Sequence, residues 1–220
     1  MRPENAIALL SGGLDSTVAL AMAADEYDIG KALFFDYGQC AAGREKRAAG
    51  EIASFYGVEL EKMELPWLGE LSSSAIIAEV PETRSSGGSG GKAVWVENRN
   101  GIFLNIAAAV AVSSGCEVVL VGFNMEEAET FPDNSVDYIN AVNRALELGE
   151  LSRVRVESHT ADMRKNDIVR EGIEREIPWE SLWSCYRGGE RMCGECESCL
   201  KLKSAVAGTA VESIINFAGE

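Results

Sequence analysis

The feature that most constrains this chain is a glycine-rich turn between an apolar run and a helix-like segment. Residues 6–10 are apolar throughout, which is typical of a short strand buried on both faces of a parallel sheet. The turn at 11–16 reads Ser-Gly-Gly-Leu-Asp-Ser, and the alanine-rich stretch at 16–24 suits a buried helix. A buried strand, a tight turn and a buried helix in this order are typical of α/β folds.

The same alternation continues along the chain. Further strands are expected at 31–35, 58–65, 117–122 and 154–157, and further helices at 44–56, 99–114, 136–148 and 166–173. Because strand and helix alternate about five times, we expect a doubly wound parallel sheet. The Gly/Ser-rich stretch at 85–91 is either a linker or a loop. Apolar character resumes directly after it, so we expect a mobile loop within one domain.

The turn has the chemistry of an anion site. Gly12 and Gly13 allow the backbone to turn tightly, and the N–H groups at the start of a helix face an anion there. Ser11, Ser16 and Thr17 add hydroxyl donors. No Gly-Lys-Ser/Thr sequence follows, which argues against kinase-like γ-phosphate transfer. The alternative is a glycine turn that a serine merely caps.

Four of the six cysteines lie close together near the C-terminus. They are Cys185, Cys193, Cys196 and Cys199. Four thiolates at this spacing are typical of a closed, structural Zn²⁺ site, and an iron–sulfur cluster is the alternative. Cys40 and Cys116 are interpreted as single packing or loop cysteines.

Composition argues against two classes of partner. The chain has 20 Lys and Arg against 35 Asp and Glu, a net charge of −15, which disfavours general binding to a phosphate backbone. We therefore expect no nucleic-acid partner. There is no apolar run of about 18 residues and no signal-peptide pattern at the N-terminus, so we expect a cytoplasmic protein without a membrane partner.

The turn resembles the Ser-Gly-Gly-x-Asp-Ser pyrophosphate loop of the N-type ATP pyrophosphatases. That resemblance implies an adenine nucleotide alpha hydrolase-like fold, cleavage of ATP between the α and β phosphates, and activation of an oxygen as its adenylate. The nucleotide-binding residues it implies are Leu10, Ser11, Gly12, Gly13, Leu14, Asp15, Ser16, Thr17, Val18, Ala19 and Leu20. Asp15 would orient Mg²⁺ or a loop amide, and Asp15 and Ser16 are candidate catalytic residues.

The whole chain is similar to the 7-cyano-7-deazaguanine synthase family. The similarity rests on the turn, on Asp-Tyr-Gly-Gln at 36–39, on Arg-Asn at 99–100 and on the cysteine cluster. It implies that 7-carboxy-7-deazaguanine is activated by ATP, aminated by ammonia to the amide, activated again and dehydrated to the nitrile. It also implies Mg²⁺ with ATP, structural Zn²⁺ and a homodimer. We accordingly expect an ATP-binding domain at 1–180 and a zinc-binding segment at 181–220 packed on it.

Three stretches depart from the family pattern. Glu97 stands where the family has proline before Arg-Asn, Cys40 and Ala41 follow Gln39 where a histidine often comes, and 130–134 reads Thr-Phe-Pro-Asp-Asn instead of Gly-Tyr-Pro-Asp-Cys. A paralogue that activates a different carboxylate therefore remains an alternative. A tRNA-thiolating enzyme is a weaker one, because the chain is acidic and the cysteine spacing is that of a closed site.

Several single residues receive predicted roles. Arg99 would bind a substrate carboxylate or a phosphate, with a surface arginine as the alternative. Lys165, which resembles a family lysine before a helix, would neutralise pyrophosphate, unless it is a solvated surface lysine. Asp133 would accept two parallel N–H bonds from a purine-like edge. We expect a solvated acidic loop at 126–129, and a surface or packing role for His159, the only histidine.

Overall fold

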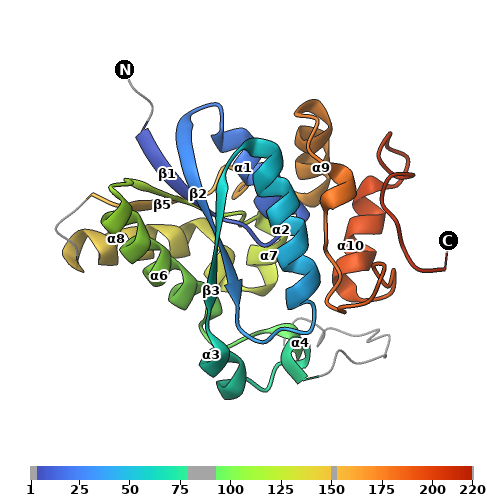
Figure 1. The fold of residues 1–220 in the computed structure, drawn as a ribbon, viewed down its shortest axis with the longest axis horizontal. Coiled ribbons are helices and arrows are strands. Elements are labelled where there is room, and N and C mark those ends of the chain that lie inside the picture. The colour runs from blue at the N-terminus through green and yellow to red at the C-terminus, as the bar shows by residue number, and fades with distance from the viewer. Residues whose placement is uncertain (1–3, 79–92, 150–152, 220) are drawn as a thin grey trace.

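Five parallel strands form the centre of the fold (Figure 1). The computed structural model describes residues 4–78, 93–149 and 153–219, so the Gly/Ser-rich stretch at 85–91 lies outside the described residues. The strands are β1 (Glu4–Leu9), β2 (Tyr27–Asp36), β3 (Glu59–Glu64), β4 (Val118–Leu120) and β5 (Arg155–Glu157). Their order in the sheet is β3-β2-β1-β4-β5, which confirms the doubly wound parallel sheet.

The direction of winding reverses beside β1. The chain passes from β1 to β2 and β3 on one side, then returns to place β4 against the free edge of β1, where Ala6 pairs with Val118 and Ala8 pairs with Leu120. The connection after β1 leads to α1 (Leu14–Ala23) on one face, and the connection after β4 leads through two short helices to α8 (Val136–Gly149) on the other face (Figure 1). In α/β sheets, ligands bind in the crevice at such a reversal point.

Helices cover both faces of the sheet. They are α1 (Leu14–Ala23), α2 (Ala42–Tyr56), α3 (Pro66–Leu71), α4 (Ala75–Ala78), α6 (Arg99–Ser114), α7 (Met125–Thr130), α8 (Val136–Gly149), α9 (Lys165–Glu174) and α10 (Glu197–Val206), with 3-10 helices η1 (Pro132–Asn134) and η2 (Trp179–Ser181). Figure 1 shows α6 and α8 on one side of the sheet and α1, α2, α9 and α10 on the other. None of the helices in the described ranges has the length and apolar character needed to cross a membrane.

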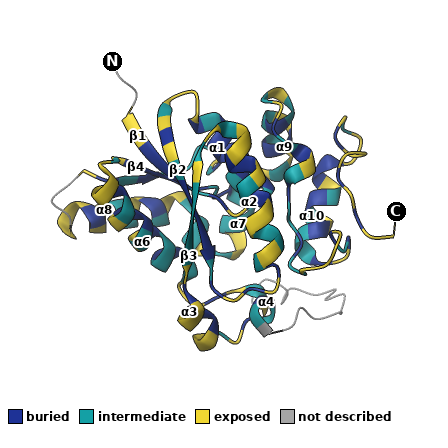
Figure 2. Ribbon diagram, viewed as in Figure 1, coloured by how far each residue is buried: buried dark blue, intermediate teal, exposed yellow. Residues whose placement is uncertain are grey.

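The alternation of side chains along the strands explains the two faces. In β1, Ala6 and Ala8 join the hydrophobic cluster under α1, α2 and α9, whereas Ile7 joins the cluster under α6 and α8. In β2, Phe34 and Phe35 divide in the same way. β1 and β2 are therefore apolar on both faces, whereas β3, at one edge of the sheet, has no buried residue (Figure 2).

The C-terminal segment continues one of these clusters. Leu202 and Val206 of α10, together with Phe217, belong to the same buried cluster as Ile168 of α9 and Val18 of α1. The segment after η2 therefore packs on the helices that follow β1 and β5, rather than forming a hydrophobic core of its own. This packing brings the cysteine cluster to the same side of the sheet as α1.

The structure differs from the sequence-based expectations mainly in short elements. β2 begins at Tyr27 instead of residue 31, because residues 27–29 pair with the start of β1, and Ile29 joins the buried cluster although Asp28 and Gly30 interrupt the apolar pattern. Pro66 begins helix α3, where proline is tolerated because the first-turn N–H needs no partner. The acidic loop expected at 126–129 is wrong: these residues lie on α7, whose first turn is capped by the Asn124 side chain.

The close packing of the turn after β1 generates a stability prediction. Gly12 has φ +81°, and a Cβ there would lie 2.7 Å from Ala48 Cβ and 2.9 Å from the Ala49 nitrogen, both on α2. Gly115 has φ +70° but open space around it. We expect Gly115→Ala to lower the free energy of unfolding by roughly 1–2 kcal/mol, and Gly12→Ala by roughly 2–5 kcal/mol. Denaturant unfolding of the two variants measures the difference, and equal losses would contradict the packing described here.

Candidate active site

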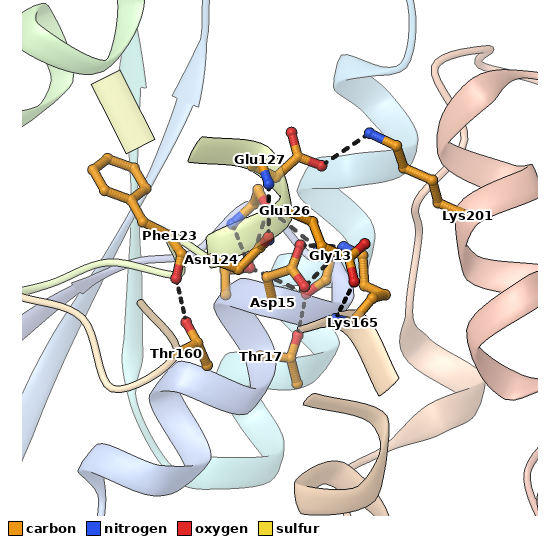
Figure 3. Close-up of polar contacts among 12 residues, drawn as sticks. Gly13, Asp15, Thr17, Phe123, Asn124, Glu126, Glu127, Thr160, Lys165 and Lys201 are labelled. Carbon is orange, nitrogen blue, oxygen red and sulfur yellow. Dashed lines mark hydrogen bonds and ion pairs between the residues drawn. The ribbon is translucent and has the colours of Figure 1, made fainter. Parts of the chain in front are cut away.

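A cleft with a volume of about 300 Å³ opens at the carboxyl ends of β1 and β4. Its walls come from the turn before α1, the end of β2, the start of α6, the stretch from Phe123 to η1, the start of α9 and the segment after η2. These segments are far apart in the sequence and meet at the reversal point of the sheet. Figure 3 shows the polar residues on the α1, α7 and α9 side of this region.

The turn holds an internal hydrogen-bond network that uses the amides of Ser11 and Gly13. The Ser11 N–H donates to Ser16 Oγ at 3.3 Å. The Ser11 and Ser16 hydroxyls share a hydrogen bond of 3.1 Å, and the Gly13 N–H donates to Ser11 Oγ at 3.3 Å. The Thr17 hydroxyl donates to the Gly13 carbonyl at 2.7 Å (Figure 3). The first N–H groups of α1 have no partner within their own helix. Together with the helix dipole, they make the turn suitable for binding an anion.

Only part of the predicted nucleotide-binding stretch, residues 10–20, lines the cleft. Leu10, Ser11, Gly13, Leu14, Asp15 and Ser16 line the cleft. Thr17, Val18, Ala19 and Leu20 are buried, and Gly12 packs on α2. The division arises because α1 runs away from the turn along the sheet, so only its first turn faces the cleft.

Asp15 and Lys165 form an ion pair in the cleft. The Lys165 ammonium lies 2.9 Å from Asp15 Oδ1 and 2.6 Å from Oδ2, and the two side chains are only 13% and 21% exposed. Lys165 is the first residue of α9, and its backbone N–H donates to Glu126 Oε1 at 3.0 Å (Figure 3). The alternative of a solvated surface lysine is therefore wrong. Two residues predicted separately stand together beside the turn at 11–16.

Arg99 faces the cleft from the start of α6. Asn98 precedes it with φ +50°, a left-handed conformation in which asparagine is one of the more tolerated residues. The Arg99 guanidinium donates to the Tyr37 hydroxyl at 3.1 Å. Although burial favours its neutral form, Tyr37 and Asp133 raise the pKa of Arg99 above its usual range, so it stays cationic. The interpretation of Arg99 as a plain surface residue is wrong.

Two carboxylic acids flank Arg99 in the cleft. Burial raises the pKa of Glu45 on α2 and the pKa of Asp133 in η1. Glu45 Oε2 accepts a hydrogen bond of 2.9 Å from the Gln39 side chain, whose carbonyl oxygen accepts from the Tyr37 N–H. Glu45 was not identified from the sequence, since an acid on an amphipathic helix has no signal that separates it from solvated acids.

Aromatic side chains form the apolar part of the lining. Phe103 of α6 stacks on Phe35 of β2 with ring centroids 4.1 Å apart, and Phe123, Phe131 and Tyr186 also line the cleft. Flat rings of this kind suit a planar heterocycle. They come from four separate segments, so only the folded chain shows that they share a site. His159 is not among the lining residues and packs edge-on against Tyr27, in line with a packing role.

The four cysteines converge in space. The Sγ atoms of Cys185, Cys193, Cys196 and Cys199 all lie within 4.8 Å of one another. The backbone N–H groups of Arg187 and Cys193 donate to Cys185 Sγ, and those of Glu195 and Cys196 donate to Cys193 Sγ, at 3.3–3.4 Å. Such N–H bonds stabilise thiolates. The donor set therefore fits a tetrahedral metal ion without an open position.

The cysteine cluster is tied directly to the cleft. The backbone N–H of Trp183 donates to the Gly12 carbonyl at 2.9 Å, and its indole N–H donates to the Cys185 carbonyl at 2.8 Å. On α10, Lys201 pairs with Glu127 of α7 at 3.5 Å (Figure 3). The segment that carries the cysteines thus also positions part of the cleft wall, including Tyr186.

Metal binding by the cysteine cluster is testable on the purified chain. We expect one tightly bound metal ion per chain and its loss in Cys196→Ser, since three thiolates leave one coordination position open. If the site contributes about 3 kcal/mol, the variant's Tm falls by roughly 6–12 °C. Cys116→Ser, outside the cluster, is the control. Elemental analysis measures the bound metal, and thermal unfolding measures the stability. A wild-type chain that unfolds at the same temperature with and without metal would contradict the metal site.

Comparison with solved structures identifies the fold. The structure of the U34-tRNA thiolase NcsA from Methanococcus maripaludis with its [4Fe-4S] cluster matches with a TM-score of 0.52 and 16% sequence identity, over 80% of this chain and 58% of that one. At this identity the likeness concerns the fold alone. It agrees with the α/β fold expected from the sequence.

Comparison with known sequences identifies the family. The chain is 44% identical over 213 residues to the 7-cyano-7-deazaguanine synthase of Carboxydothermus hydrogenoformans, covering 93% of this chain and 99% of that protein. It is 45% identical over 213 residues to the enzyme of the same name from Methanosarcina mazei, covering 89% and 90%. A family model described as "Queuosine biosynthesis protein QueC" matches residues 5–209. The chain therefore belongs to the QueC family of queuosine biosynthesis proteins.

Proposed function

We propose that this chain converts 7-carboxy-7-deazaguanine and ammonia into 7-cyano-7-deazaguanine with ATP as the activating reagent. The observation that carries the proposal is the 44% identity, over 99% of its length, to a protein named 7-cyano-7-deazaguanine synthase. The anion-binding turn at the reversal point of the sheet supports the use of a nucleotide.

The reaction needs two activations of the same carbon. In the first, a carboxylate oxygen attacks the α-phosphate of ATP, pyrophosphate leaves, and ammonia then displaces AMP from the acyl adenylate to give the amide. In the second, the amide oxygen attacks another ATP, pyrophosphate leaves again, and loss of AMP with two protons gives the nitrile. Both activations have the same leaving group, so one phosphate-binding turn serves both.

The lining residues suit this chemistry by position and charge. We assign binding of the pyrophosphate to the turn amides and to Lys165, which stands 2.6 Å from Asp15 at the start of α1. Asp15 is the acidic residue suited to hold Mg²⁺, which neutralises phosphate charge when it is bound. Arg99 is assigned to the substrate carboxylate or to the α-phosphate. These groups stabilise charge and orient the reactants, and the adenylate itself supplies the electrophile.

The metal we propose for the cysteine cluster is Zn²⁺. A tetrahedral Zn²⁺ with Zn–S bonds of about 2.3 Å holds its sulfur atoms about 3.8 Å apart. The distance between Cys193 Sγ and Cys199 Sγ is 3.9 Å, which supports a single ion rather than a multi-iron cluster. The homodimeric assembly, the cytoplasmic location and the absence of a nucleic-acid partner, expected from the sequence, belong to the same proposal.

Direct turnover tests the proposal. The purified chain with ATP, Mg²⁺, ammonium and 7-carboxy-7-deazaguanine should yield first the amide and then the nitrile, with AMP and pyrophosphate, as followed by mass spectrometry. Omission of ammonium is the control and should abolish both products. Consumption of ATP with another heterocyclic carboxylate, but not with this one, would instead identify a paralogue.

The Asp15–Lys165 pair generates a second test. Lys165→Gln removes the cation that faces the leaving pyrophosphate, and we expect kcat/KM to fall by roughly 10²–10³-fold. Asp15→Asn should have a comparable effect and should also raise the Mg²⁺ concentration needed for half-maximal rate. Lys62→Gln is the control, because Lys62 pairs with Asp36 at 2.7 Å and neither residue lines the cleft. Full activity of Lys165→Gln, with an unchanged Tm, would refute the assignment.

A further inference from the structure

Asp133 differs from the other carboxylates of the cleft in what it contacts. Asp15 pairs with Lys165, Glu127 pairs with Lys201, and Glu45 accepts a hydrogen bond from Gln39. Within the described ranges, Asp133 forms no ion pair, and the side-chain hydrogen bond recorded for it is a long one of 3.4 Å from its neighbour Asn134. Asp133 is therefore the lining acid whose oxygens are least used by the protein itself.

The backbone around Asp133 is held in place. The Asn100 side chain of α6 donates to the Asp133 carbonyl at 3.3 Å, next to Arg99 in the sequence. Pro132 begins the 3-10 helix η1, and its carbonyl accepts a hydrogen bond of 2.6 Å from the Ser135 hydroxyl. A carboxylate on such an anchored turn loses little conformational freedom when it binds a ligand.

The surroundings of Asp133 favour a flat ligand and strong hydrogen bonds. Phe103, Phe123 and Phe131 line the same cleft. Asp133 is half-buried, and burial raises the pKa of its carboxyl although the nearby Arg99 charge acts in the opposite direction. A hydrogen bond to a half-buried carboxylate discriminates between ligands. A ligand without the matching donor removes water from the carboxylate and gives it no hydrogen bond in return.

The heterocycle of the proposed substrate presents a matching edge. Its pyrimidinone ring carries a ring N–H and an exocyclic amino group side by side, so two donors point in the same direction. A carboxylate offers two parallel acceptors and pairs with both. The corresponding edge of adenine carries one acceptor and one donor, which a carboxylate cannot pair with in the same way. An unpaired acid in an aromatic cleft thus suits the substrate ring better than the adenine of ATP.

We propose that Asp133 is the residue that selects the substrate ring, by accepting hydrogen bonds from the N–H and amino group of its 2-amino-pyrimidinone edge. This inference rests on the proposed function, because it takes 7-carboxy-7-deazaguanine as the substrate. Arg99, held beside Asp133 through Asn100, then faces the carboxylate or phosphate end of the reaction. The substrate is bound at its two ends by groups of opposite charge.

A substrate that lacks the amino group tests this assignment. Wild-type and Asp133→Asn chains are compared on 7-carboxy-7-deazaguanine and on its analogue without the 2-amino group. With the wild type, we expect kcat/KM to be at least about 100-fold higher for the amino substrate. With Asp133→Asn, that preference should shrink to within about tenfold, because the amide has one acceptor and one donor. The KM for ATP should change by less than about threefold.

Three controls separate the possible outcomes. Asp137→Asn makes the same chemical change at an exposed residue outside the cleft and should leave the preference unchanged. Thermal unfolding shows whether Asp133→Asn is folded. Calorimetric binding of 7-cyano-7-deazaguanine, with and without its 2-amino group, measures the same preference without turnover. The inference would be overturned if Asp133→Asn kept the preference for the 2-amino substrate. It would also be overturned if Glu45→Gln, rather than Asp133→Asn, lost that preference. Wild type that binds the ring selectively but forms no nitrile would refute the proposed function alone.

Discussion

The cleft depends on how closely three stretches of backbone approach one another at the end of β1. Gly12, in a left-handed conformation, lies against Ala48 and Ala49 of α2, and a Cβ on Gly122 after β4 would lie 2.5 Å from the Ser16 nitrogen. The Trp183 N–H bonds to the Gly12 carbonyl from the third side. A larger residue at Gly12 would displace α2, and one at Gly122 would displace the first turn of α1. The same packing therefore fixes the turn at 11–16 at the edge of the cleft.

The cleft carries positively charged side chains although the chain as a whole is strongly acidic. The protein carries −15 overall, yet both reactants proposed for it, ATP and a carboxylate, are anions. Among the residues that the structure describes, the cations that line the cleft are Lys165, held by Asp15, and Arg99, held by the Tyr37 hydroxyl. In a site shielded from water, a fixed cation acts on a bound anion more strongly than a surface lysine does. Local arrangement, rather than net charge, therefore determines which ligands bind.

The sequence predicted the parts of the site that are local in the chain. The strand–turn–helix at 6–24, the start of α6 at Arg99 and the four cysteines all follow patterns that need no knowledge of distant residues. The pairing of Asp15 with Lys165, the aromatic wall and the half-buried acid Glu45 could not be predicted in this way, because they arise from segments brought together by the sheet. Short helix α7 was interpreted as a loop, because its run of acidic residues resembles a solvated surface.

The cysteine cluster orders a segment of the chain that lines the cleft. The stretch between η2 and α10 has little regular secondary structure, and yet Trp183, Ser184 and Tyr186 line the cleft. A segment without a hydrogen-bond ladder is ordered only if something else offsets its conformational entropy. Four thiolates that converge within 4.8 Å, together with the Lys201–Glu127 pair, supply such a cross-link. A metal at this site would therefore shape the wall of the cleft, although none of the four cysteines lines it.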